Sequence, residues 1–241
     1  KYSEEMIQHF VNGDKGYNDN NHYSMLMKDH SFQQTHNVSI SGGNAQTQYY
    51  ISGNFNQDKG ILNNPELGYH RFNFQGNVTT QITENLKVNY QSSFNYSKRH
   101  GLPANVNMNI FYYALLSDRA LSPTVVDDPN HWTYMAQAEG RNVIAIVNGL
   151  GGHDDTYMQS YTNNIDVKYT VPQIKGLVLN AYASYETNTR QTNALTLAFP
   201  LYDYWSNTLV GQNGDQNEYS ENWNKNSTLY GKLQANYNKK F

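Results

Sequence analysis

The stretch from residue 69 to residue 98 constrains the fold most, because its side chains alternate between two faces along two long arms. Successive side chains of a strand point to opposite faces, so a period of two indicates β-strands. Ordinary strands centre on about five or six residues, and both arms are longer. A short turn at 83–85 joins them into a hairpin. Apolar or small residues fill one face: Phe72, Phe74, Gly76, Val78, Thr80, Ile82, Leu86, Val88, Tyr90, Ser92, Phe94 and Tyr96.

The same alternation recurs in five further segments, which are 36–41, 47–56, 161–171, 177–186 and 229–238. With the hairpin, they predict about seven long strands. The connections alternate in length: short ones lie at 43–46, 83–85 and 172–176, and long ones at 57–68, 98–156 and 190–226. An up-and-down antiparallel arrangement then places every long loop at one end, as outer-membrane barrels do. The sequence therefore predicts an all-β fold, namely part of a transmembrane β-barrel wall with long extracellular loops.

The charged side chains within the predicted strands all fall on the polar face. A lysine or arginine on a lipid face costs about 2–4 kcal/mol at mid-bilayer, so this one-sidedness favours a barrel wall. A water-soluble sandwich would also keep its charges outside, but it does not explain long strands together with one-ended loops. The predicted lumen-facing residues are Arg71, Lys87, Asp166, Lys168, Glu186 and Lys232.

Composition narrows the classes further. Charged residues make up 15% of the chain, against about 25% in typical soluble domains, which suits either a barrel wall or a secreted polar β-protein. The net charge of −3 gives no basic footprint for nucleic acid. Cysteine is absent, which excludes a disulfide framework and a thiolate metal site. The sequence contains no run of about 18 apolar residues, so it predicts no transmembrane helix.

Residues 3–12 read as a short amphipathic helix, with Ser3 as its N-cap and Gly13 at its end. A second short helix is predicted at 110–116, inside the longest connection. We expect two parts: residues 1–34 lead into the barrel, and residues 35–241 form an incomplete barrel. The first residues lack the apolar region of a signal peptide, so we expect an internal piece of a longer protein.

Several motifs resemble the SusC/RagA family of TonB-dependent outer-membrane transporters of Bacteroidetes. They are His-Asn-Val-Ser-Ile-Ser-Gly-Gly at 36–43, Tyr-Tyr-Ile-Ser-Gly-Asn-Phe at 49–55, Gln-Asp-Lys-Gly-Ile at 57–61, Arg-Phe-Asn at 71–73 and Ile-Thr-Glu-Asn-Leu-Lys at 82–87. The match is dense over 17–98 and thinner to 241. The family usually has Trp where this chain has His22, and Pro where it has Val143.

This resemblance implies a location in the outer membrane, in contact with lipid, as part of a 22-stranded barrel. It implies a SusD-like surface lipoprotein as partner. It also implies a plug and a TonB box, which this stretch does not contain, so the TonB complex would bind outside these residues. It also implies import of oligosaccharides or, in some members, peptides. The alternative function is a secreted all-β glycan-binding module, whose apolar faces would be buried against a second sheet.

No catalytic constellation, metal site or cofactor motif is predicted, and we expect no enzyme activity. The eight His show no ligand spacing for zinc, and no two carboxylates are placed at a defined separation. Aromatic residues of the long loops are candidates for ligand binding, because flat amphipathic rings stack on sugars. Packing within a loop, or contact with the lipoprotein, is the more common role of a single Trp. These candidates are Trp132, Tyr134, Trp205 and Trp223.

Overall fold

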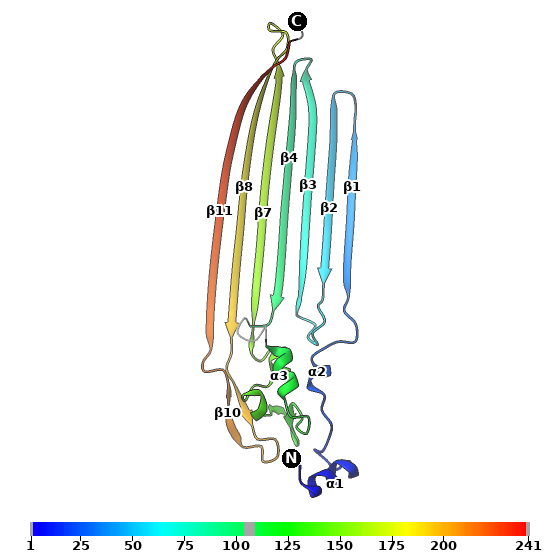
Figure 1. Ribbon diagram of the computed structural model, residues 1–241, viewed down its shortest axis with the longest axis vertical. Helices are drawn as coiled ribbons and strands as arrows, with labels where there is room; N and C mark the ends of the chain where they lie inside the picture. Colours follow the sequence, from blue (N-terminus) through cyan, green and yellow to red (C-terminus); the bar gives the residue numbers. More distant parts are fainter. Residues whose placement is uncertain (1, 104–108, 240–241) are drawn as a thin grey trace.

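The computed structural model describes residues 2–103 and 109–239; residues 104–108, within the predicted long connection, lie outside that description. One seven-stranded antiparallel sheet, here called the wall, dominates the chain (Figure 1). Each strand pairs with its neighbours in sequence order, in the order β1-β2-β3-β4-β7-β8-β11, which confirms the predicted all-β, up-and-down fold. The bounds are β1 Gln33–Gly43, β2 Thr47–Asp58, β3 Gly68–Thr83, β4 Leu86–Gly101, β7 Gly152–Thr170, β8 Leu177–Thr196 and β11 Glu218–Tyr237.

The short turns at one end hold the register of the wall. In the first turn, Asn44 Oδ1 accepts hydrogen bonds from the backbone N–H groups of Gln46 and Thr47, at 2.9 and 2.8 Å. In the third turn, Gly176 has a φ of 93°, which favours glycine. A Cβ there would also lie only 2.0 Å from the carbonyl oxygen of Asn238. These turns allow long strands to pair without slipping, so the two faces predicted from the sequence remain distinct.

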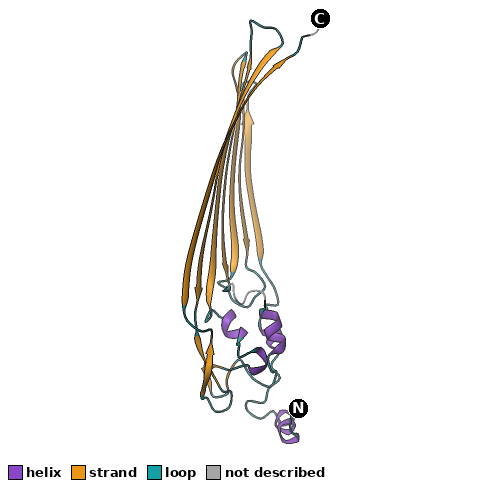
Figure 2. Ribbon diagram, turned by 60° about the vertical axis from the view of Figure 1, so that its left-hand side comes forward, coloured by secondary structure: helices purple, strands orange, loops and turns teal. Residues whose placement is uncertain are grey.

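The long connections fold together at the opposite end of the wall into a compact body, here called the cap (Figure 2). It comprises the described residues of 14–32, 59–67, 102–151 and 197–217. Its elements are α2 His22–Met25, α3 Ile110–Leu116, β5 Thr124–Val125, β6 Asp128–Trp132, the 3-10 helix η1 Ala136–Ala138, α4 Val143–Val147, β9 Phe199–Tyr202 and β10 Leu209–Asn213. The predicted one-ended arrangement of long loops is therefore confirmed.

The hydrophobic core lies entirely in the cap. Leu26, Ile110 and Ile146 are among its fully buried side chains. Leu67 and Leu201, from two other connections, join the same cluster. None of the buried hydrophobic residues in the described chain belongs to the seven strands of the wall.

Both predicted helices are present. Helix α1, Glu4–Asn12, begins after Ser3, whose hydroxyl accepts from the Met6 N–H, and ends at Gly13 in the left-handed conformation. Helix α3 has the predicted bounds. None of the helices among the described residues is long and apolar enough to cross a membrane.

The structure corrects the extent of four strands, β4, β7, β8 and β11. The predicted connection 190–226 is shorter, because β8 continues to Thr196 and β11 begins at Glu218. The predicted connection 98–156 likewise reduces to 102–151. One consequence concerns Trp223, whose predicted place in a loop is wrong: it lies within β11.

Candidate functional site

One face of the wall carries a continuous apolar band. The register aligns Val78 with Tyr49 on one side and Tyr90 on the other, and Tyr90 with Ile165. Phe74, Val78 and Leu179 are 39%, 38% and 41% exposed, and no second layer of the described chain covers this face. Other exposed members are Val38, Ile40, Ile51, Phe55, Phe72, Leu229 and Leu233.

The height of this band can be compared with a bilayer. The apolar stretch from Leu86 to Tyr96 spans roughly 33 Å along β4 at about 3.3 Å per residue. For a strand tilted by about 40°, that length gives a vertical height of about 25 Å, the height of the apolar band on outer-membrane barrels.

Toward the cap, the same face changes from apolar to mixed polar and aromatic. The Lys98 ammonium lies 5.3 Å from the centre of the Tyr157 ring. In the same cross-strand row, Tyr157 is followed by Gln191 and Trp223, and Trp223 is 69% exposed. Aromatic rings beside polar groups at the edge of an apolar band are typical of a membrane–water boundary.

The opposite face is polar over its whole length. The register places on it all six residues that were predicted to face a lumen, but it spreads them over several rows. Lys87 and Lys168 lie directly opposite each other, and Asp166 and Lys232 flank Tyr182 in one row. Asp166, Tyr182 and Lys232 line a shallow hollow of about 370 Å³. Glu186 and Arg71 lie nearer the cap, in separate rows.

A larger hollow of about 640 Å³ lies on this polar face in the half of the wall nearer the cap. Arg71 on β3 and Arg190 on β8 belong to the same row, with Ser97 and Met158 between them. Sequence reasoning missed Arg190, because it placed this residue at the start of a loop. The other residues that line the hollow are Tyr69, Asn95, Tyr96, Gln159, Ser160, Asn188, Thr189, Asn224 and Asn226.

The candidate loop aromatics do not form one site. Trp132 and Tyr134 are partly buried and pack against the core of the cap. Trp205 is 43% exposed, and its ring lies 4.7 Å from that of Tyr17 and 4.8 Å from that of Tyr204. Trp223 is separate from all three, on the apolar face of β11.

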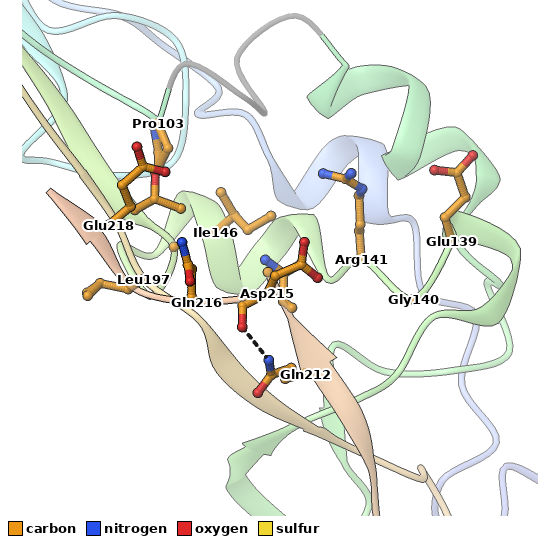
Figure 3. Close-up of a pocket in the computed structure, with 14 residues that line it drawn as sticks. Pro103, Glu139, Gly140, Arg141, Ile146, Leu197, Gln212, Asp215, Gln216 and Glu218 are labelled. Carbon is orange, nitrogen blue, oxygen red and sulfur yellow. Dashed lines mark hydrogen bonds between the residues drawn. The ribbon is translucent and has the colours of Figure 1, made fainter. Parts of the chain in front are cut away.

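A third pocket, of about 660 Å³, lies where the cap meets the ends of β8 and β11. Figure 3 shows Gln212, Asp215 and Gln216 on one side of it, with Ile146 opposite and Arg141 and Glu139 beyond. The Gln212 amide donates to the backbone oxygen of Asp215 at 3.0 Å. The Arg141 guanidinium lies 5.0 Å from the centre of the Tyr113 ring, whose hydroxyl donates to Glu139. Charges of both signs are thus already engaged around this pocket.

Two buried polar residues organise the cap. Asn142 donates through Nδ2 to the carbonyls of Pro123 and Thr133, at 2.7 and 2.9 Å, and its Oδ1 caps α4 through the Ala145 N–H. His22 lies within hydrogen-bonding distance of the carbonyls of Asp118 and Leu121 through Nε2, and burial lowers the pKa of its imidazole. The residues beside them in the sequence gave little sign of these roles, because the partner carbonyls lie far away in the chain.

No group of three or more His, Asp or Glu side chains in the described ranges gathers closely enough to hold a metal ion. The ion pair of Arg119 with Asp19 is bidentate and exposed, and it joins the 14–32 segment to the longest connection.

No protein-family model matches the chain, and no curated protein matches it. Two solved structures are similar in fold. A chain of the RagAB peptide importer in its closed-closed state matches with a TM-score of 0.66 and 20% identity, over 92% of this chain and 24% of that chain. A chain of the RagAB peptide transporter matches with a TM-score of 0.55 and 15% identity, over 91% of this chain and 32% of that chain. This chain therefore spans about a quarter of the length of the first and about a third of the length of the second.

Proposed function

We propose that this chain forms part of the barrel wall of a TonB-dependent importer in the bacterial outer membrane, which takes up oligosaccharides or peptides. In this proposal the apolar band faces lipid, the polar face lines the lumen, and the cap lies on the extracellular side. The protein binds and moves its ligand without changing it chemically.

The observation that carries the proposal is the exposed apolar band together with its position relative to the cap. Burial of apolar surface contributes roughly 25 cal/mol per Å², so a band of this size left in water is strongly unfavourable. Lipid removes that penalty. The fold likeness to RagAB chains and the SusC/RagA-like motifs support the same reading, since both point to import through an outer-membrane barrel.

The partners follow from the same proposal. Among the described residues, β1 and β11 each pair on one side only. Further strands of the barrel would therefore pair with their outer edges. A SusD-like lipoprotein would dock on the extracellular side, against the cap. The TonB complex would act through a plug outside the stretch described. Residues 1–34 would lead into the barrel and 35–241 would contribute wall and loops.

The alternative is a secreted glycan-binding module with its apolar faces buried between two sheets. The other two sheets among the described residues are two-stranded and belong to the cap. A second large sheet that could cover the apolar band is therefore not found in this part of the chain.

Deletion of the parent gene tests the proposal. We expect loss of growth on one oligosaccharide or peptide mixture as sole nutrient, with normal growth on its monomers and restoration by the gene supplied in trans. Unchanged growth on every such nutrient, together with recovery of the 241-residue chain as a folded soluble monomer, would favour the secreted module instead.

A further inference from the structure

We propose that the hollow between Arg71 and Arg190 binds the carboxylates of an acidic oligopeptide. The inference rests on the proposed import function and adds the class of ligand: a peptide that carries aspartate or glutamate side chains. The hollow lies on the polar face, in the half of the wall nearer the cap. A ligand would reach it after passing the cap from the extracellular side.

The two arginines are placed to act on one extended ligand. They occupy the same cross-strand row, three strand spacings apart, which corresponds to roughly 14 Å at about 4.8 Å per spacing. An extended peptide rises about 3.3 Å per residue, so acidic residues four positions apart lie roughly 13 Å from each other. Ser97 and Met158, between the arginines, are uncharged and leave that path open.

The charge of the hollow has one sign. No Asp or Glu is among its lining residues, and neither arginine forms an ion pair with another described residue. Three acids farther along the strands on this face accept hydrogen bonds from within the chain. Asp58 accepts from the Gly60 N–H at 2.8 Å, Glu186 from the Asn188 amide at 2.6 Å, and Asp154 from the Thr156 hydroxyl at 3.4 Å. Arginine binds carboxylates through a planar fork of donors, so an unpaired arginine pair favours this ligand group.

The position of Arg71 is held by one bond that leaves its fork available. Its Nε donates to Asn73 Oδ1 at 2.8 Å, and no other hydrogen bond of its guanidinium occurs among the described residues. The two terminal nitrogens therefore remain free to bind a ligand. Such pre-orientation lowers the entropy lost when a carboxylate binds.

The rest of the lining favours a peptide over an acidic sugar. Asn95, Asn188, Asn224 and Asn226 each offer an amide donor and an amide acceptor, which matches the paired donor and acceptor of a peptide group. Met158 and the ring of Tyr69, which lie on the same face as the arginines, add apolar surface for uncharged side chains.

Binding to the full-length parent protein in detergent, measured by titration calorimetry, tests the inference. The probe is a blocked seven-residue alanine peptide with aspartate at its second and sixth positions, and the matched probe has asparagine there. Each lost hydrogen bond to a charged group should weaken binding by about tenfold or more. We therefore expect the double variant R71Q/R190Q to bind the aspartate peptide about 100-fold more weakly than the unaltered protein. Binding of the asparagine peptide should not change.

The control variant is Lys225→Gln, which removes one positive charge from β11 beside the hollow but on the opposite face. It should leave both affinities unchanged. Both arginines are exposed, and equal circular dichroism spectra and equal amounts at the cell surface establish that the variants fold.

Three results would overturn the inference: failure of the unaltered protein to bind the aspartate peptide, equal loss of both peptides in the double variant, or arginine-dependent binding of tetragalacturonate alone. None of these results would contradict the proposed import function, which the gene deletion tests separately. Loss of growth in the deletion strain, with any of these three results, would leave an importer that does not select acidic peptides.

Discussion

The wall and the cap use their apolar residues in opposite ways. In the cap, side chains from several connections converge on one core, as in a small water-soluble domain. In the wall, the apolar side chains form a single exposed face with nothing of the described chain over it. One chain thus contains a part that carries its own core and a part whose apolar surface must be covered from outside.

The difference teaches which solvent each part is built for. The cap buries apolar side chains against one another, which suits it to water. A two-faced sheet with one apolar face is suited to a boundary between lipid and water. Single substitutions in the cap and in the wall should therefore have different effects.

The largest effect is expected in the core of the cap. Ile146 is 1% exposed, so Ile146→Ala leaves a cavity and should destabilise the cap by about 2–5 kcal/mol. Hydrogen exchange of the full-length protein should then accelerate at cap amides but not at wall amides. Leu229→Ala, at a wall position with 79% exposure, is the matched truncation and should leave cap exchange unchanged. Equal acceleration in both parts would mean that they unfold as one unit.

A charge in the apolar band should produce an effect almost as large, but only in lipid. Ile165→Lys is expected to destabilise the protein by about 2–4 kcal/mol when it is folded in phospholipid vesicles. Ile165 is 41% exposed to solvent within this chain, so a lysine there would be nearly neutral for a wall that stood in water. Asn164→Lys, at the adjacent position on the polar face, is the control. Similar denaturant midpoints for the two lysine variants would contradict the assignment of faces.

Removal of a buried polar side chain should have an intermediate effect on the cap. Asn142→Ala takes the donor away from the carbonyls of Pro123 and Thr133 and removes the N-cap of α4. Leaving buried acceptors unsatisfied costs about 1–3 kcal/mol. Loss of protection at the amides of α4 in hydrogen exchange measures this effect. Asn148→Ala, at the exposed end of the same helix, should have little influence, and equal losses in the two variants would assign no special role to Asn142.

The smallest effect is a dependence of cap stability on pH. Burial lowers the pKa of His22 in the folded cap, so the unfolded chain takes up its proton first as the pH falls. The contribution of neutral His22 is therefore fully present above the unfolded pKa of about 6.5 and is lost progressively below it. Thermal unfolding of the cap followed between pH 7 and pH 5 should show this decline. His22→Gln should flatten it, and an unchanged slope in this variant would assign the decline to other groups.

The wall was predictable from the sequence because its two faces have opposite character. Phe74 and Val78 alternate with Asn73 and Asn77, and the structure keeps that alternation where β3 pairs with β2 and with β4. The short turns and the one-ended loops followed from the spacing of these strands. Helix α1 was predictable because Ser3 and Gly13 mark its ends.

The alternation fades near the cap, and there the prediction failed. Between the apolar band and the cap, both faces carry polar residues. The part of β11 around Trp223 and Lys225 therefore shows no difference in hydrophobicity between odd and even positions. The period of two that identifies a strand requires such a contrast. For this reason β8 and β11 were predicted too short, and Trp223 was assigned to a loop.

The interior of the cap was not predictable from local pattern. Its apolar residues come from connections far apart in the sequence, and the short elements α4 and β9 have too few residues to show a period. The partner carbonyls of Asn142 lie 19 and 9 residues away in the chain. The candidate ligand site was predicted only in part. Arg71 was assigned to the polar face, whereas Arg190, three strands away in the same row, was assigned to a loop.

The most direct test of a lipid-facing and a water-facing side of the wall is the accessibility of spin labels on the intact protein in native outer membranes. The 241 residues of this chain contain no cysteine. In a background where any cysteine elsewhere in the protein is replaced by serine, Ile165→Cys and Asn164→Cys each allow a single label at adjacent positions of β7. The account predicts that the label at 165 collides with lipid-soluble oxygen and the label at 164 with a water-soluble nickel complex. Equal accessibility of both labels to the nickel complex would contradict a lipid-facing band and, with it, the proposed wall.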